Sequence, residues 1–147
     1  MSSNANLYNK VVLPAVKTTD SIESKMYNGF STVNTSTENF KLYDIELVKQ
    51  DILNHFYVRQ GERLMQPSFG TIIWDMLFEP LTEQLKSLII QNVNDILNSE
   101  PRVRTTQVIV STYQSGIQIE CQLTYLPYNI SQALQLRFDQ ANGLLTR

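Results

Sequence analysis

The feature that most constrains this chain is a change of period at Glu100, Pro101 and Arg102. Before these residues, apolar side chains recur at three- and four-residue steps, which is the spacing of one face of an α-helix. After them, apolar and polar residues alternate, as in a strand with one buried face. Proline cannot donate a helical hydrogen bond and disfavours the helical region for the residue before it. The sequence therefore predicts helices followed by strands.

Two helices are expected between residues 42 and 79, ahead of a third and longer one. The first covers residues 42–58, with Asp44 as its N-cap and a glycine in "RQGER" just past its end. A shorter helix is expected over Thr71–Glu79, where Pro80 interrupts the pattern. The aromatic-rich stretch Phe69–Phe78 is interpreted as part of the core, because such stripes are core more often than they are ligand sites.

A longer helix is predicted over Thr82–Ser99. The hydroxyl of Thr82 can cap its first turn, and the negative charge of Glu83 suits the N-terminal end of the helix dipole. Apolar residues form one stripe along this segment, which predicts a single buried face. The stripe consists of Leu85, Leu88, Ile89, Val93, Ile96 and Leu97.

Three strands are predicted after Pro101. The first two form a hairpin around "QSG" (Gln114–Gly116), and the third covers Leu134–Asp139. In the first strand, alternation places Val108, Val110 and Thr112 on a shared face. In the returning strand it directs apolar side chains inward, and these are Ile117, Ile119, Cys121, Leu123 and Tyr125.

The predicted fold class is α+β, with N-terminal helices packed on a small antiparallel sheet of about three strands. Three strands cannot close into a barrel, so an outer strand keeps an open edge of unpaired N–H and C=O groups. Such an edge can accept a strand from another chain. We expect the strand Leu134–Asp139 to lie near the receiving edge.

The first 41 residues differ in composition from the rest. Ser31–Asn39 is rich in serine, threonine and asparagine, and it is interpreted as a linker. Leu7–Val16 is apolar enough to dock on a partner, although a frayed terminus is the alternative. The predicted organisation is therefore a flexible or partner-docked extension over residues 1–41 and an α+β domain over residues 42–147.

Composition excludes several classes of protein. The 147 residues are 42% hydrophobic, which is enough for one globular core. Twelve basic and fourteen acidic residues give a net charge of −2 without a basic stripe, so no nucleic-acid partner is expected. A single cysteine, Cys121, excludes an internal disulfide framework and fits a reducing compartment, so synthesis in a cytoplasm is expected. No apolar run approaches the roughly 18 residues that span a membrane.

Catalytic and metal-binding patterns are not found in the sequence. His55 is the single histidine and no histidine–cysteine cluster exists, so no metal site is expected. The glycines are scattered, which excludes a phosphate-binding loop. Glu79 and Glu100 could in principle hydrolyse a glycosidic bond, but neither lies in a context that predicts a raised pKa. We therefore expect no enzyme, no catalytic residue, no cofactor and no small-molecule substrate.

The Glu-Pro-Arg corner allows two interpretations. A negative charge on Glu100 at a helix C-terminus opposes the helix dipole, and the guanidinium of Arg102 can compensate for it. The two side chains could therefore form a self-capping pair within the chain. Alternatively, Pro101 holds both charges in a fixed geometry that is presented to a partner.

The order of several motifs resembles the baseplate wedge and sheath-initiator family of contractile-tailed phages and related injection machines, including the type VI secretion baseplate. The resemblance covers about Asp44 to Gln140, and its most specific element is Glu100, Pro101 and Arg102 between a helix and a strand. The order is "RQGERLMQPSFG", "LFEPLT", "SEPRV" and then the hairpin. The supporting residues are Gly61, Arg63, Pro67, Phe69, Gly70, Leu77, Phe78 and Glu79.

This resemblance implies a structural protein of the virion tail baseplate. It implies that Glu100, Pro101 and Arg102 bind the helical core bundle of other wedge proteins. It also implies that the sheet accepts strands of the tail sheath protein and so starts sheath assembly, with the tail tube as a further candidate partner. The expected sheath-binding residues are Leu134, Gln135, Leu136, Arg137 and Phe138. The alternatives are a lysozyme-like glycosidase of a tail baseplate and a generic interaction adaptor.

Overall fold

The computed structural model describes residues 25–31 and 41–147. Leu7–Val16 and residues 32–39 of the expected linker lie outside the described residues. No helix in the described ranges is long and apolar enough to cross a membrane. The elements are β1 (Asn28–Phe30), β2 (Lys41–Tyr43), α1 (Asp44–Tyr57), α2 (Ile73–Met76), α3 (Glu83–Asn98), β3 (Val103–Tyr113), β4 (Gly116–Tyr125), β5 (Ile130–Asp139) and β6 (Gly143–Thr146).

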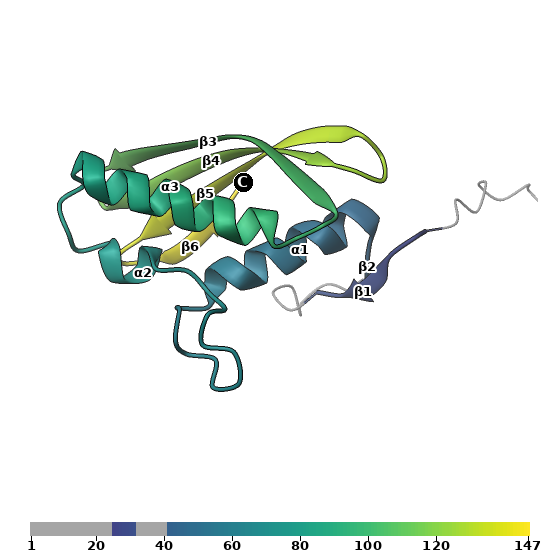
Figure 1. Cartoon of the computed structure of the whole chain (residues 1–147), viewed down its shortest axis with the longest axis horizontal. Helices are drawn as coiled ribbons and strands as arrows, with labels where there is room; N and C mark the ends of the chain where they lie inside the picture. The colour runs from purple at the N-terminus through teal and green to yellow at the C-terminus, as the bar shows by residue number, and fades with distance from the viewer. Residues whose placement is uncertain (1–24, 32–40) are drawn as a thin grey trace, which may run out of the picture.

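The main sheet is antiparallel, with the strand order β3-β4-β5-β6. Figure 1 shows α3 lying across one face of this sheet and α1 running below it. The α+β class with antiparallel pairing is thus confirmed, but the expected number of about three strands is wrong. The sheet contains a fourth strand, β6, whose four residues are too few for alternation to be recognised in the sequence.

A second sheet, formed by β1 and β2, was not predicted from the sequence. These three-residue strands pair antiparallel, with Gly29 opposite Leu42. The expected boundary after residue 41 falls inside β2, and β1 pairs with β2 across it. The division into two domains stays a prediction.

The core lies between the helices and the inward face of the sheet. All the inward residues predicted for β4 are buried, and Leu134, Leu136 and Phe138 continue the same face on β5. The ring of Trp74 meets that of Phe138 edge-on, with 5.1 Å between the ring centroids. Each large apolar side chain buried in this way stabilises the fold by about 1.5–3 kcal/mol.

The predicted ends of the long helices are confirmed, with one correction. Thr82 caps α3 by accepting a hydrogen bond from the backbone N–H of Leu85 at 3.2 Å. Asp44 does not cap α1, because Tyr43 occupies the N-cap position without a side-chain bond. The Asp44 carboxylate instead accepts hydrogen bonds from the N–H groups of Met26 at 2.8 Å and Tyr27 at 3.0 Å. These bonds hold the pKa of Asp44 below its ordinary value.

The hairpin between β3 and β4 turns at Gln114 and Ser115, as predicted. Gly116 is required there because a Cβ atom would lie 1.8 Å from the backbone oxygen of Phe138. The register of β3 against β4 shifts between Thr105 and Gln107, which is a β-bulge.

Candidate functional site

The charged corner, defined as Glu100, Pro101 and Arg102, joins α3 to β3. The guanidinium of Arg102 grips the Glu100 carboxylate with two donors, Nε to Oε1 at 2.5 Å and Nη2 to Oε2 at 2.7 Å. The Arg102 backbone N–H also donates to Oε1, at 3.3 Å. The two side chains are only 21% and 17% exposed. The self-capping pair therefore forms within the chain.

Arg102 also connects the corner to other parts of the fold. Its Nη2 donates to Oδ2 of Asp51 on α1 at 2.7 Å, and its guanidinium lies 5.3 Å from the centroid of the Tyr27 ring. The hydrogen bonds from Arg102 lower the pKa of Glu100, and those to Glu100 and then Asp51 raise the pKa of Arg102. Both groups are therefore charged at neutral pH, and the corner is held from several sides.

The hydrogen bonds of Arg102 do not involve every nitrogen of its guanidinium. Nε and Nη2 have acceptors, whereas Nη1 has no hydrogen-bond partner among the described residues. The corner can therefore be a self-paired unit and still offer donors to a second molecule. The interpretation as a partner-binding site stays a prediction.

The corner lines an open groove of about 1130 Å³ between α1, α3 and the loop after α1. Four carboxylates line it, and the two arginines beside them are Arg63 and Arg102, the second of which is already paired. This excess of negative charge favours a partner that brings cationic groups. The four acidic residues are Asp51, Glu62, Asp95 and Glu100.

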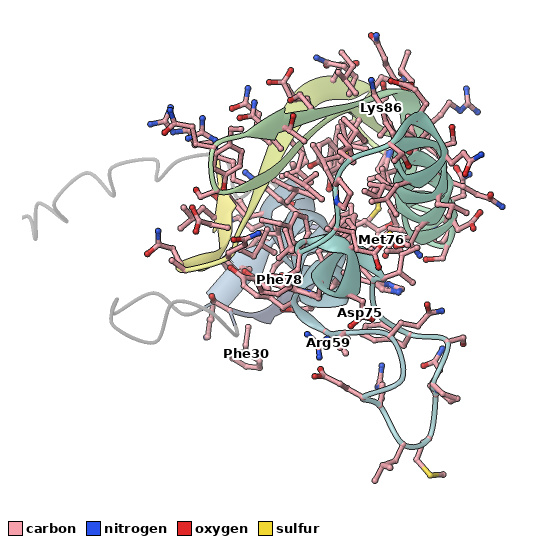
Figure 2. The ribbon with its side chains drawn as sticks, turned by 90° about the vertical axis from the view of Figure 1, so that its left-hand side faces the viewer. Phe30, Arg59, Asp75, Met76, Phe78 and Lys86 are labelled. Atoms are coloured by element: carbon pink, nitrogen blue, oxygen red, sulfur yellow. The ribbon has the colours of Figure 1, made fainter. Side chains whose placement is uncertain are left out.

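The other wall of the groove is the finger loop, which we define as residues 59–70. Hydrogen bonds close its base: the N–H of Gln60 donates to the oxygen of Thr71 at 3.1 Å, and the N–H of Thr71 to that of Val58 at 2.9 Å. Gly70 adopts a φ of +109°, and a Cβ there would lie 2.6 Å from the Val58 oxygen. Figure 2 shows this loop projecting from the body next to Arg59 and Asp75.

His55 belongs to the same region. Its ring stacks on that of Phe69 with 3.9 Å between the centroids, and burial lowers its pKa. It therefore supports the finger loop as a neutral aromatic ring. None of the described residues forms a group of three histidine, cysteine or acidic side chains that could hold a metal ion.

The expected receiving residues, Leu134–Phe138, lie in β5. Leu134, Leu136 and Phe138 are buried in the core, and Gln135 and Arg137 belong to the opposite face. The backbone is paired on both sides over much of this stretch: β5 pairs with β4 throughout, and its residues Leu136–Asp139 pair with β6. The expectation that Leu134–Phe138 accept a sheath strand stays a prediction, and the pairing with β6 leaves the start of β5 more accessible than its end.

The start of β5 differs from its end. Gln135 exchanges two hydrogen bonds with Arg147, at 3.2 and 3.0 Å, and the pairing with β6 stops there. Residues 130–134 pair with β4 alone among the described residues. The hairpin that carries them extends past α3 (Figure 1). This stretch is an edge of the sheet, and β3 is the edge on the other side.

The outer face of the sheet carries a polar row. Glu120 accepts hydrogen bonds from Gln118 at 2.9 Å and Gln135 at 3.1 Å, while Nε of Arg137 donates to Gln118 at 2.9 Å. The side chains of this row, from β4 and β5, are thus already bonded to one another on the face away from the helices.

Sequence reasoning missed two parts of the site. The Asp51 contact joins residues 51 positions apart, which no local pattern indicates. The finger loop has a weak sequence signal, because the adjacent Leu64 and Met65 interrupt an otherwise polar segment. The two carboxylates considered for glycoside hydrolysis are not activated as a pair, since the pKa of Glu100 is lowered whereas a general acid needs a raised one.

Comparisons with known proteins agree with this geometry. A family model described as baseplate wedge protein gp25 matches residues 42–128. The crystal structure of a proposed tail lysozyme from Geobacter sulfurreducens is 24% identical to the chain, with a TM-score of 0.57, and the match covers 64% of this chain and 88% of the other. The baseplate of the anti-feeding prophage contains a chain that is 24% identical, with a TM-score of 0.55, over 66% of this chain and 83% of its own length. No curated protein sequence matches.

Proposed function

This chain belongs to the baseplate wedge protein gp25 family, and on that premise we propose that it is anchored in the wedge by its charged corner and starts sheath assembly at its sheet edge. The family assigns it a structural role in the tail baseplate of a contractile injection system. The anchor and the sheath-binding edge are our proposals, as are the sheath and tube as partners.

The observation that carries the anchor is the fixed position of Arg102. Its bonds to Glu100 and Asp51 hold the guanidinium at the wall of an acidic groove, and residues 25–31 and 41–147 provide no partner for the Nη1 donors. A preorganised donor loses little conformational entropy on binding. We propose that a carbonyl or carboxylate of another wedge protein accepts from Nη1, and that Pro101 keeps the corner stiff.

Substitution of Arg102 tests the anchor. We expect Arg102→Ala to weaken binding to the purified wedge proteins of the same baseplate by about tenfold or more, as for a truncated interface hot spot. Arg104→Ala is the matched control, because Arg104 is an exposed arginine two residues further along β3. Isothermal titration calorimetry measures the affinities, and circular dichroism checks that each variant is folded. Equal binding by the two variants would refute the anchor.

For the sheath-binding edge, we propose residues 130–134 of β5 instead of the whole of Leu134–Phe138. Neighbouring residues of an antiparallel strand direct their N–H and C=O groups to opposite sides. The N–H and C=O groups of Gln135 point toward Arg147. Those of Ser131 and Ala133 therefore point to the same side of β5, where the described residues provide no pairing strand. A sheath strand that continued the line of β6 would meet these groups.

Removal of one backbone donor tests this edge. Ala133→Pro deletes an N–H that has no partner in the part of the chain that the structure describes, and proline is tolerated at such edge positions. We expect fewer sheath subunits to assemble on baseplates that carry this variant, as counted by electron microscopy, with the melting temperature near that of the parent protein. Ala133→Ser keeps the N–H and serves as the control. Normal sheath assembly on the proline variant would contradict the proposed edge.

A glycosidase is not favoured as a second function. The similarity to the Geobacter structure is at the level of the fold, and the pKa of Glu100 is shifted in the direction opposite to that of a catalytic acid.

A further inference from the structure

We propose that the tip of the finger loop is a second docking element, which inserts Leu64 and Met65 into an apolar pocket of the wedge protein that contacts the charged corner. This inference rests on the proposed anchor. Leu64 is 94% exposed and Met65 is 95% exposed, and both are large apolar side chains. Single exposed apolar residues are common on protein surfaces, whereas an adjacent pair at the tip of a projecting loop is typical of an interaction site.

The finger loop is exposed and yet internally ordered. Every residue from 59 to 68 is exposed. The N–H of Gly61 nevertheless donates to the oxygen of Pro67 at 2.9 Å, across the neck of the loop. Further turns form where Gln66 donates to Arg63 at 3.1 Å and Phe69 donates to Gln66 at 3.0 Å. These bonds constrain the backbone on both sides of the apolar tip.

Side chains fix the loop to the body. Arg63 lies over the ring of Phe69, which in turn stacks on His55 of α1. At the base, Nε of Arg59 lies 3.3 Å from Oδ1 of Asp75, and the two side chains lie near each other in Figure 2. A loop held in this way presents its tip without a large entropy loss on binding.

The position of the finger loop identifies its partner. Residues on both sides of the tip, Arg63 and Gln66, line the same groove as Glu100 and Arg102. A protein that fills the groove therefore reaches the tip as well. The chemistry expected of it is an apolar pocket beside cationic groups, since four carboxylates line the groove. A second copy of this chain and a lipid surface are the competing occupants.

Paired substitutions test the inference. We expect the double variant Leu64→Ser, Met65→Ser to bind the purified wedge proteins at least about tenfold more weakly, while its melting temperature stays that of the parent protein. Leu88→Ser is the matched control, because Leu88 is an exposed leucine on α3, 49% accessible and outside the loop. If the double variant binds normally while Arg102→Ala does not, the finger-loop inference is refuted and the proposed anchor stands. If both bind normally, the anchor fails as well.

A cysteine at the tip distinguishes the occupants. The native Cys121 is buried, and burial raises the pKa of its thiol to about 12, so it should not compete for a maleimide at neutral pH. Met65→Cys should react fully in the free chain and be protected in the complex with the wedge proteins. Reaction at an equal rate in the complex would overturn the inference. So would protection of the isolated chain at high concentration, or protection by phospholipid vesicles alone, because these outcomes assign the tip to another occupant.

Discussion

A single guanidinium holds together three parts of this molecule that are distant in sequence. Arg102 bonds to Glu100 beside it and to Asp51 on α1, and it lies over the ring of Tyr27. Charge-assisted hydrogen bonds shielded from water contribute about 1.5–3 kcal/mol each. The bond to Asp51 contributes less, because the Asp51 side chain is 42% exposed. The negative charge of Glu100 at the C-terminal end of α3 is unfavourable for the helix dipole, and the positive charge of Arg102 offsets it.

Acid should weaken this corner. The pKa of Glu100 lies below its usual 4.5, because the hydrogen bonds from Arg102 favour the carboxylate. A lowered pKa in the folded state stabilises the protein above the ordinary pKa of glutamate, and this stabilisation is lost as the pH falls through the lowered value. We expect the melting temperature to drop as the pH falls below 4.5, and to drop less in Glu100→Gln. Parallel melting curves of the two proteins over this range would contradict the role of Glu100.

At the scale of the elements, the sheet is completed by its shortest strand. β6 pairs with β5 from Leu136 to Asp139 and contributes Leu144 to the core. Asp139 fastens the connection between the two strands, because its carboxylate accepts hydrogen bonds from the N–H groups of Ala141 at 2.8 Å and Asn142 at 3.2 Å. The position where β6 stops pairing determines which part of β5 is left as an edge.

Two adjacent leucines test the docking of β6. Leu144 is 8% exposed, whereas Leu145 is 46% exposed on the opposite face. We expect Leu144→Ala to lower the free energy of unfolding by about 2–4 kcal/mol, because it leaves a cavity in the core. Leu145→Ala should change it by less than about 0.5 kcal/mol, as for most surface substitutions. Urea denaturation measures both, and a reversed order would show that β6 docks in the other register.

At the scale of the whole molecule, the proposed interaction surfaces lie in different parts of the fold. The acidic groove and the finger loop adjoin α1 and α3, and the unpaired stretch of β5 lies in the sheet. On our proposal, separate surfaces would allow one chain to bind a wedge protein and a sheath strand at the same time. This arrangement suits a component that connects two parts of a baseplate.

A structural role predicts no hydrolysis of cell-wall polymer. We expect a suspension of peptidoglycan to keep its turbidity over hours with this protein, while an equal concentration of a lysozyme clears it. The reason is that Glu100 is a paired carboxylate with a lowered pKa, which cannot serve as the general acid. Clearing that is lost in Glu100→Gln would overturn this expectation.

The sequence by itself determined the elements whose signals are local. Thr82 and Pro101 mark the ends of the α3 region, and the alternation after Pro101 identifies β3, β4 and the inward face of β5, because a helix period and a strand period can be read within a short window. The motif order, which is also local, indicated the family that the comparisons then showed.

The tertiary structure alone decided the contacts between distant residues. The carboxylate of Asp44 binds Met26 and Tyr27 instead of capping its own helix, and Asp51 reaches Arg102 across 51 positions. β6 is recognisable as a strand only because β5 lies beside it, and its presence places Gln135–Asp139 inside the sheet. Such pairings depend on which surfaces the packed core brings together, and hydrophobic burial depends on the amount of area buried, not on the sequence separation of the residues.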